Sequence, residues 1–424
     1  MSGGSGPGPV RPLSIALVHY AADPVVGGVE RVLRGQAVVL ADAGHDVRIV
    51  AGRGASPDAR VRFVGIPLLD PRHPTIERLQ GDLDAGRVPA GFSAAVAELD
   101  AALSAALAGV DVVIAHNVCS LNLNLPLTAA LRAIADRGAP QRLVNWHHDL
   151  AATSPHYRST LHDGRPWDLV REAWPGVVQV VVSEGRRREL ADLMGLAPAS
   201  IAVVPNGIDL AGTWKLEPET AGLLARTDLL AMAPLLLVPA RLTPRKNVEL
   251  ALHVVAAMRA AGRPAGLLVT GPADPYRSGG RDYLVRLLAL RRSLGLDDAA
   301  RFLATELGGP PSDALVCDLF RLADALLLPS RDEGFGLPIL EAAVHRLPIV
   351  CADLPALREI AGDAALYVAP DDDPAAIAAR VLERLDSDPV ARLAMRVRSE
   401  HSWQAIYRTR IAPLLRVDGR TAGS

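Results

Sequence analysis

Two kinds of segment alternate along almost the whole chain: short runs that are continuously apolar, and longer segments whose apolar residues recur at helical intervals. Leu13–Val18 and Ala325–Leu328 belong to the first kind, which is typical of strands buried on both faces of a parallel sheet. Val29–Ala43 belongs to the second kind, because its apolar residues fall three and four positions apart. This alternation predicts an α/β protein built on parallel sheets.

The same two patterns predict the other elements. Strands are predicted at Val47–Val50, Asp111–Ala115, Leu143–Trp146, Val177–Val182, Ile201–Val204, Leu235–Pro239, Gly266–Thr270, Arg301–Leu303, Pro348–Cys351 and Ala365–Val368. Helices are predicted at Ser93–Ala108, Gly185–Met194, Val248–Ala261, Asp282–Leu294, Ser312–Leu322, Leu337–Val344 and from His401 to about Leu415. Asp70–Ala90 and Tyr157–Trp174 are predicted to be irregular loops.

These elements form two runs that join near Ile208–Trp214, which predicts two Rossmann-like domains facing each other across a cleft. With 424 residues the chain is long enough for both domains to have a core of their own. The first residues, MSGGSGPGPVRP, are rich in Gly, Pro and Ser and lack the apolar core of a signal peptide, so residues 1–11 are predicted to be a disordered tail. Residues 12–208 and 209–400 are the predicted domains.

Charge and cysteine usage narrow the class of protein. The formal net charge of −2 gives no electrostatic reason to expect a nucleic-acid partner. No stretch reaches the roughly 18 apolar residues of a spanning helix, so we expect no integral membrane segment. Cys119, Cys317 and Cys351 have neither metal-ligand nor disulfide spacing, which is typical of a reducing cytoplasm.

Two charged clusters each have two interpretations. Arg186, Arg187 and Arg188 on the helix Gly185–Met194 either dock on a membrane surface or form an ordinary solvated face, and we favour the second. Asp371-Asp372-Asp373 resembles a metal-binding Asp-x-Asp, but Pro374 and an Ala-rich helical segment follow it. It is therefore predicted to be a helix start, and no metal site is expected.

The stretch Ser330–Arg346, SRDEGFGLPILEAAVHR, carries the strongest chemical signal. Glu333 and Glu341 stand eight positions apart, across a glycine-rich turn that follows a predicted buried strand and precedes a predicted helix. Both carboxylates are expected to face the crevice at the carboxyl ends of the strands, where open α/β sheets bind ligands. Carboxylates in that position are suitable acceptors for the hydroxyls of a sugar.

This stretch resembles the Glu-x7-Glu signature of the retaining glycosyltransferases of family 4, which have the GT-B fold. Four other segments resemble the same family in the expected order: Gly27-Gly28-Val29-Glu30, His148-Asp149, Pro205-Asn206-Gly207-Ile208-Asp209, and Arg241 followed by Lys246. The resemblance covers nearly the whole chain after the tail. It implies that residues 401–424 form a helix that crosses back to the first domain.

The resemblance also implies roles for individual residues. The donor-binding residues are Gly27, Gly28, Asn206, Arg241, Lys246, Glu333, Gly334, Phe335, Gly336, Leu337 and Glu341, and the catalytic residues are His148, Arg241, Lys246 and Glu333. His116, Asn117 and Asp149 are expected to contact the acceptor. A guanidinium and an ammonium at one strand-to-helix turn can neutralise a diphosphate without a metal.

His147 and His148 follow the same predicted strand, and adjacent strand residues point to opposite sides. They would therefore not bind a metal together. We prefer His148 as the residue that faces the site, with a pKa close to neutral that would let it orient or deprotonate an acceptor hydroxyl.

The implied reaction is the transfer of a hexose from a nucleotide-diphospho-sugar, of UDP-glucose or GDP-mannose type, to a hydroxyl acceptor with retention of configuration. No cofactor is required, Mg²⁺ is not essential, and the acceptor is taken to be a small polar compatible-solute precursor. A GT-B nucleotide-sugar 2-epimerase, a phosphorylase and a non-catalytic sugar-binding module are the alternatives. A homodimer and peripheral membrane contact stay open.

Overall fold

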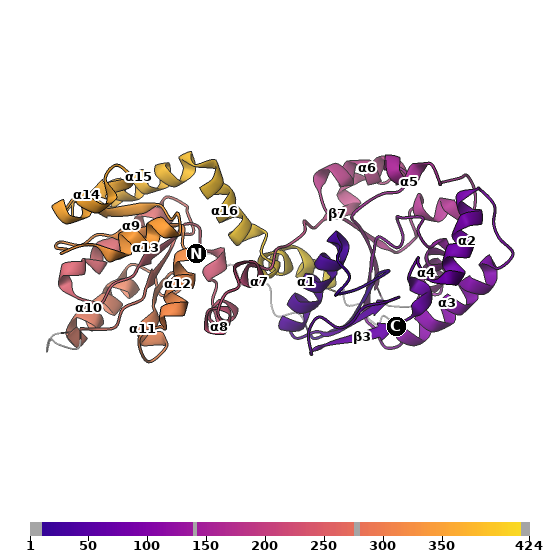
Figure 1. Cartoon of the computed structure of the whole chain (residues 1–424), viewed down its shortest axis with the longest axis horizontal. Coiled ribbons are helices and arrows are strands. Elements are labelled where there is room, and N and C mark those ends of the chain that lie inside the picture. The colour runs from indigo at the N-terminus through magenta and orange to yellow at the C-terminus, as the bar shows by residue number, and fades with distance from the viewer. Residues whose placement is uncertain (1–10, 139–141, 275–279, 417–424) are drawn as a thin grey trace, which may run out of the picture. The chain divides into compact units, whose positions relative to one another are not determined.

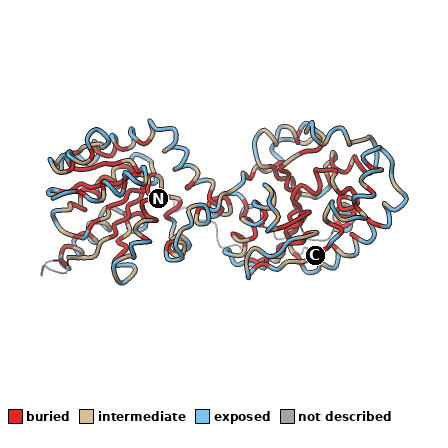
Figure 2. Tube along the Cα trace, in the orientation of Figure 1, coloured by how far each residue is buried: buried red, intermediate tan, exposed pale blue. Residues whose placement is uncertain are grey.

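The computed structural model describes residues 11–138, 142–274 and 280–416 (Figure 1). The chain divides into two compact units, residues 1–208 with 406–424 and residues 209–405. Each unit is a parallel sheet covered by helices. Figure 2 shows the buried residues concentrated along the strands, as expected for sheets with both faces covered.

The first unit contains a seven-stranded sheet in the order β3-β2-β1-β4-β5-β6-β7. Its strands are β1 (Ser14–Val18), β2 (Asp46–Ala51), β3 (Val61–Gly65), β4 (Val112–His116), β5 (Arg142–His147), β6 (Val178–Val181) and β7 (Ile201–Val203). Its helices include α1 (Gly28–Asp42), α2 (Pro74–Asp84), α3 (Phe92–Ala106), α4 (Leu125–Asp136), α5 (Pro155–Arg158) and α6 (Glu184–Met194). The strand order reverses between β1 and β4, so the ligand crevice of such a sheet lies at their carboxyl ends.

The second unit contains a six-stranded sheet in the order β10-β9-β8-β11-β12-β13. Its strands are β8 (Leu235–Val238), β9 (Gly266–Val269), β10 (Ala300–Phe302), β11 (Ala325–Leu328), β12 (Ile349–Ala352) and β13 (Ala365–Val368). Its helices include α7 (Leu210–Trp214), α8 (Pro218–Arg226), α9 (Val248–Ala260), α10 (Gly280–Ser293), α11 (Leu303–Glu306), α12 (Asp313–Leu322), α13 (Leu337–Val344), α14 (Pro355–Ala361), α15 (Pro374–Ser387) and α16 (Pro389–Glu400). Here the order reverses between β8 and β11.

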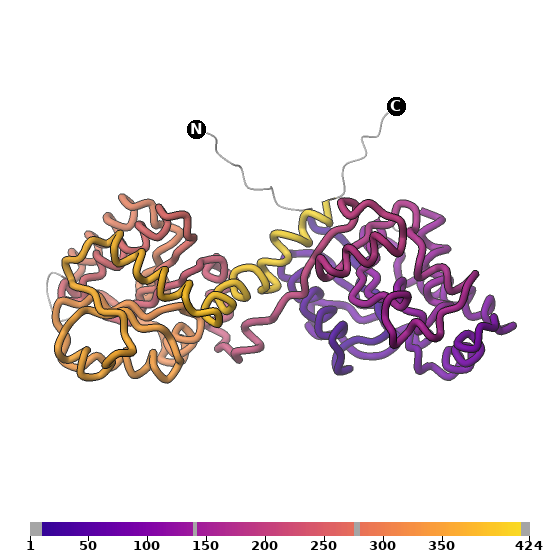
Figure 3. Tube along the Cα trace, turned by 90° about the horizontal axis from the view of Figure 1, so that it is seen from above, coloured from indigo at the N-terminus to yellow at the C-terminus, as the bar shows by residue number. Residues whose placement is uncertain are grey.

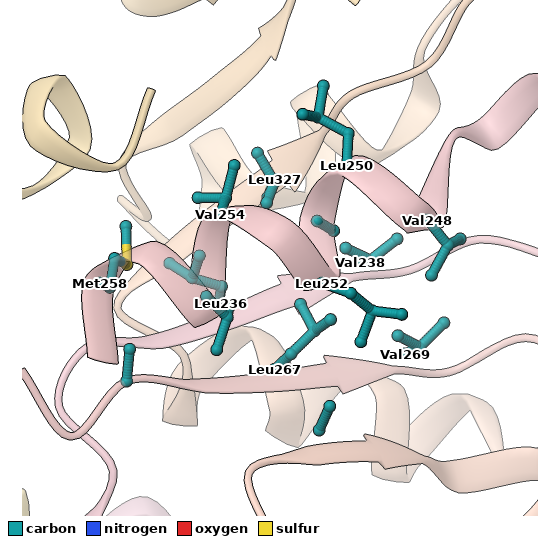
Figure 4. Packing of buried hydrophobic residues seen from close by; sticks show 14 of the residues in the cluster. Leu236, Val238, Val248, Leu250, Leu252, Val254, Met258, Leu267, Val269 and Leu327 are labelled. Atoms are coloured by element: carbon teal, nitrogen blue, oxygen red, sulfur yellow. The ribbon is translucent and has the colours of Figure 1, made fainter. Parts of the chain in front are cut away.

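The core of the second unit shows how the apolar pattern produces this fold. Figure 4 shows α9 packed on the sheet, with Val248, Leu252 and Met258 close to side chains of β8 and β9. Complete burial of such a side chain contributes about 1.5–3 kcal/mol relative to leaving it exposed. The continuous apolar strands therefore become the centre of each unit.

The last described segment, residues 406–416, belongs to the first unit. After α17 (Trp403–Ile406), a π-helical turn at Tyr407–Ile411 leads into α18 (Ala412–Leu415). His45 hydrogen-bonds to the Tyr407 hydroxyl at 2.9 Å, and the Arg142 guanidinium donates to the Leu414 carbonyl. Figure 3 shows this yellow segment beside indigo elements of the first unit.

The α/β class with two Rossmann-like parallel sheets is confirmed. The loop prediction for Asp70–Ala90 is wrong, because most of this segment is helix α2. Pro74 occupies the first turn, where its missing N–H costs nothing, and the ring nitrogen of His73 accepts from the Thr75 amide at 3.3 Å. Ile76, Leu79 and Leu83 then bury one helical face.

Other elements were not predicted or differ in detail. The sequence patterns missed β3, α4, α8, α14 and α16, as well as the short helices α5, α7 and α11. Tyr157–Trp174 contains only short helical turns, but Trp167 and Trp174 are buried in the unit. The interpretation of Asp371–Asp373 as a helix start is confirmed, since the Asp373 carboxylate accepts from the Ala375 amide at 3.2 Å at the start of α15. Among the described residues, no helix has the length and hydrophobicity to cross a membrane.

Candidate functional site

In the second unit, the loops after β8 and β11 meet because the two strands are neighbours. Lys246 follows β8 and Glu333 follows β11, and the Lys246 ammonium forms a short ion pair with Glu333 Oε1. The Ser330 hydroxyl donates to the same oxygen at 2.7 Å, and the Arg245 guanidinium lies 3.6 Å from Glu333 Oε2. The side chains of Lys246 and Glu333 are only 14% and 8% exposed, so the pair is largely shielded from water.

Backbone contacts fix this arrangement. The Arg331 amide donates to the Arg245 carbonyl at 2.7 Å and so joins the two loops. Asn247, with φ of 51°, ends the turn that carries Lys246, and its side-chain amide donates to the Pro370 carbonyl at 3.2 Å. Asparagine is among the few residues that adopt this left-handed conformation readily.

A cavity of about 440 Å³ opens beside this ion pair. It is lined by Pro239, Ala240, Arg241, Thr243, Pro244, Arg245, Lys246 and Asp274. Arg241 is exposed, and no ion pair joins it to another of the described residues. Three cations and one carboxylate, Asp274, therefore line this cavity, and two of the cations also contact Glu333. The excess of positive charge suits a ligand with more than one negative charge.

Gly336 permits the turn between the two predicted glutamate positions. Its φ is 95°, and a Cβ atom there would lie 2.4 Å from a methyl carbon of Leu357. Helix α13 begins directly after it, with Phe335 and Leu337 each 57% exposed.

Glu341 is on the exposed face of α13 and does not join the Lys246 cluster. It lines a different cavity of about 290 Å³, between α12 and α13. The structure thus places Arg241 and Lys246 at one cavity, with Glu333 paired to Lys246, and places Glu341 at another cavity. Gly334 is also exposed, with open space around it.

In the first unit, three histidines gather at the carboxyl ends of β1, β4 and β5. His19 Nδ1 donates to the His116 carbonyl at 2.8 Å, and His116 Nδ1 lies 3.1 Å from His148 Nε2. His19 Nε2 lies 3.9 Å from a carboxylate oxygen of Glu30. The sequence analysis gave no site role to His19, although His19 follows β1 in the same way that His116 ends β4, and it named Glu30 only as part of the glycine segment.

Burial sets the charge of these imidazoles. It lowers the pKa of His148 to about 3, assisted by the nearby His19 and His147, and lowers that of His116 well below its ordinary value. The expectation that the pKa of His148 lies close to neutral is therefore wrong. A neutral His148 can orient a hydroxyl by hydrogen bonding, but its imidazole does not carry the second proton, and therefore no charge, at neutral pH.

His147 and His148 lie in different surroundings. His147 Nε2 lies 2.8 Å from Gln179 Oε1. His147 is 1% exposed, and this burial lowers its pKa to about 4. His148 instead meets His116 at the crevice end. The preference for His148 over His147 agrees with this geometry, while its role stays a prediction.

Asn117 holds the turn that carries His148. Its backbone has φ of 58°, and its side-chain oxygen accepts from the amides of His148 at 2.7 Å and Asp149 at 3.2 Å. Asn117 is 3% exposed, and its side-chain oxygen is already engaged by these two amides. The Asn117 side-chain oxygen thus holds the turn that carries His148, and the acceptor contact that the resemblance implies stays a prediction.

The basic helix α6 is largely neutralised by its own surroundings. Arg186 pairs with Asp149 at 3.2 Å and Glu189 at 2.7 Å, and Arg187 pairs with Glu184 at 2.6 Å. This pairing favours the solvated face over a membrane-docking surface. Asp149, with its side chain 46% exposed, remains open toward solvent.

The predicted glycine loop is shaped by Glu30. A Cβ atom on Gly27 would lie 2.0 Å from Glu30 Oε2, so the carboxylate lies directly over this glycine at the start of α1. Gly28 has open space around it, and Asn206 is exposed after β7.

Comparison with known proteins places the chain in a class. The family model described as glycosyltransferase family 4 matches residues 26–211, and the model described as glycosyl transferases group 1 matches residues 233–387. One match therefore falls on each unit, in the order of the GT-B enzymes. The chain belongs to the family 4 glycosyltransferases.

Two curated relatives indicate the range of the family. The D-inositol 3-phosphate glycosyltransferase of Kineococcus radiotolerans is 34% identical over 231 residues, which cover 52% of this chain and 51% of the relative. The chain thus spans about half the length of the inositol phosphate enzymes it matches. The MMP alpha-(1->4)-mannosyltransferase of Mycolicibacterium hassiacum is 26% identical over an alignment that covers 97% of this chain and 100% of the relative. The solved sucrose-phosphate synthase of Thermosynechococcus elongatus aligns with 94% of this chain and 97% of its own, at 20% identity and a TM-score of 0.36.

Proposed function

We propose that this protein is a retaining glycosyltransferase that moves a hexose from a nucleotide-diphospho-sugar to a hydroxyl acceptor. The observation that carries the proposal is the cavity lined by Arg241, Arg245 and Lys246 at the strand-order reversal of the second unit, with Glu333 paired to Lys246 beside it. Donors of UDP-glucose or GDP-mannose type fit this chemistry.

The proposed mechanism uses the charge of the cluster. As the sugar–phosphate bond breaks, negative charge grows on the leaving diphosphate, and Arg241 and Lys246 stabilise it. Glu333 holds the Lys246 ammonium in place through the ion pair and receives the hydroxyls of the transferred sugar. The donor phosphate takes the acceptor's proton on the face from which it departs, so His148 is left to orient the acceptor hydroxyl as a neutral imidazole.

The acceptor is proposed to be a small polar molecule that carries hydroxyl groups. The names of relatives that act on inositol 3-phosphate support this class. Asp149, open toward solvent beside His148, and the Tyr157 hydroxyl, which lies near it, are suitable partners for a polyol.

A pyridoxal-phosphate phosphorylase does not fit the lysines of the chain. Lys246 is paired with Glu333, and Lys215, the other lysine, is exposed at the end of α7. Lys246 lines the 440 Å³ cavity, but its ammonium is already engaged by Glu333, and Lys215 is not among the residues that line this cavity. No structural feature favours the epimerase over the transferase.

The first test is a thermal-shift panel of UDP, GDP and ADP in buffer with excess EDTA. One diphosphate at about 100 times its Kd should stabilise the folded protein by about 2.7 kcal/mol, and no metal should be needed because cations of the chain bind the phosphates. Release of that diphosphate from its hexose donor, followed by mass spectrometry, then tests transfer. A panel without any shift in EDTA that responds only after Mn²⁺ is added would contradict metal-free binding.

A second experiment separates the two glutamates. Glu341→Gln weakens a charge-assisted hydrogen bond to the donor ribose and should reduce affinity for the bare diphosphate about tenfold. Glu333→Gln should leave that affinity within about threefold, since the freed Lys246 still meets the phosphates, and should lower turnover instead. Calorimetry with the diphosphate measures the first effect, and donor turnover measures the second. If the two variants exchange these phenotypes, the assigned roles are reversed.

A further inference from the structure

The cavity between α12 and α13 contains a thiol and an imidazole that the proposed reaction does not use. Side chains at helical intervals on both helices line it: Asp313, Val316, Cys317 and Phe320 from α12, and Glu341, Val344 and His345 from the end of α13. Figure 1 labels both helices. A thiol, an imidazole and two carboxylates thus share about 290 Å³.

Cys317 differs from the other two cysteines of the chain. Cys119 and Cys351 are 2% and 0% exposed, and burial raises the pKa of both thiols, that of Cys351 to about 11. Both therefore stay protonated and out of reach of a solute. Cys317 is partly exposed and lines the cavity, so it is the one of these three free thiols that a small molecule can reach.

His345 is placed to act on this thiol. Cys317 Sγ and His345 Nε2 lie 3.7 Å apart, within hydrogen-bond distance for sulfur. The imidazole stacks on Phe320 at a centroid distance of 5.7 Å and an interplanar angle of 12°, which fixes the ring. The His345 amide also donates to the Glu341 carbonyl at 3.3 Å. The base is held in one orientation beside the sulfur.

We propose that Cys317 is a reactive thiol, activated by His345, that is modified by low-molecular-weight disulfides in this cavity. His345 Nε2 takes the thiol proton, and the Cys317 sulfur attacks one sulfur of the disulfide. A new S–S bond forms as the old one breaks, and the leaving thiolate receives the proton from His345. The Cys317 sulfur is oxidised and the leaving sulfur is reduced, so no other reactant is needed.

The modification would also act on the donor site. The added group occupies the cavity that Glu341 lines, and Glu341 is the proposed ribose ligand. We therefore expect modified protein to bind nucleoside diphosphate more weakly. This part rests on the proposed function, whereas the reactivity of Cys317 does not.

Reaction of the native full chain with 4,4′-dithiodipyridine, followed by absorbance and peptide mass spectrometry, measures the thiol directly. One fast thiol, Cys317, is expected, with Cys119 and Cys351 reacting only after unfolding in urea. Cys317→Ser should abolish the fast phase. His345→Asn should slow it at least about tenfold, because general-base assistance is lost.

A matched control supplies the rate of an ordinary exposed thiol. Ala379 is exposed in the middle of α15, so Ala379→Cys in the Cys317→Ser background presents a thiol on a helix surface far from a helix end. Cys317 should react faster than this introduced thiol at pH 7. An equal or slower rate, or a rate that His345→Asn and His345→Gln both leave unchanged, overturns the proposal.

The donor-site effect is measured on protein treated with glutathione disulfide. Calorimetry should show at least about tenfold weaker diphosphate binding, restored by dithiothreitol and absent in Cys317→Ser. Unchanged affinity after complete modification would refute the link to the donor site. Absence of diphosphate binding in the untreated protein would instead count against the proposed function, and the labelling result would be unaffected.

Discussion

Lys246→Ala is expected to lower donor turnover by about 10²–10³-fold, because its ammonium stabilises charge that appears only as the diphosphate leaves. Arg241→Ala is expected to act similarly. Initial rates of diphosphate release at saturating donor measure both. The loss should fall mainly on kcat, since the interaction strengthens in the transition state.

The chain provides a matched control for this substitution. Lys215 is the other lysine, and it is exposed at the C-terminal end of α7. Lys215→Ala removes the same group from an exposed position that does not line the Lys246 cavity and should leave turnover unchanged. Near-normal turnover in both Lys246→Ala and Arg241→Ala, with folding verified by circular dichroism, would refute the assignment of the diphosphate to these cations.

Lys246→Ala also leaves Glu333 without its closest cation. Because Glu333 is 8% exposed, an unpaired carboxylate there is unfavourable, although Ser330 and Arg245 still contact it. Lys246→Arg keeps the charge and so separates this effect from catalysis. Turnover that recovers only partly in Lys246→Arg is expected, since a planar fork does not replace a compact ammonium.

The meeting of Lys246 and Glu333 could be predicted from the sequence in part. Both follow strongly apolar strands, Leu235–Val238 and Ala325–Leu328, and parallel strands end at one edge of a sheet. Their direct ion pair depends on β8 and β11 being neighbours, which the sequence pattern does not contain. The direct ion pair could therefore be identified only from the structure.

The histidine cluster was harder to predict from the sequence for the same reason. His19, His116 and His148 are far apart along the chain, and they meet because β1, β4 and β5 are consecutive in the sheet. Burial then determines their charge, and burial is a property of the packed unit rather than of any one segment. Local patterns identified His148 and His116 as candidates but gave the wrong expectation for the pKa of His148.

The missed helix α2 has a different cause. Its apolar residues Ile76, Leu79 and Leu83 do follow a helical spacing, but prolines and charges around them outweighed that signal. A proline at the first helical position starts a helix instead of breaking one. The sequence contained the information, and the interpretation of Pro74 was at fault.

The largest effect on stability is expected from Arg398 in α16. Arg398 is 2% exposed, and its guanidinium donates to the carbonyls of Leu229 at 3.1 Å and Leu230 at 3.3 Å. It also forms a short ion pair with Asp324, whose carboxylate accepts from the Leu235 amide at 2.6 Å. One buried side chain therefore joins α16 to the starts of β8 and β11.

Arg398→Met should reduce the free energy of unfolding by about 3–5 kcal/mol, because Asp324 is left buried without its partner. Urea unfolding followed by circular dichroism measures the loss. Arg396→Ala, on the exposed face of the same helix, is the control and should change stability by less than about 0.5 kcal/mol.

The pH dependence distinguishes a lost ion pair from lost packing. Burial already raises the pKa of Asp324, and Arg398 is the main cation that opposes this shift. Without Arg398 the carboxyl should take up a proton at higher pH in the folded state than in the unfolded state, so its charge destabilises the variant progressively as pH rises. The deficit of Arg398→Met relative to the parent chain should therefore be larger at pH 7 than at pH 5, and Asp324→Asn in the same background should remove that difference. A deficit that is equal at both pH values would show that packing of the Arg398 side chain, not its charge, stabilises this end of the sheet.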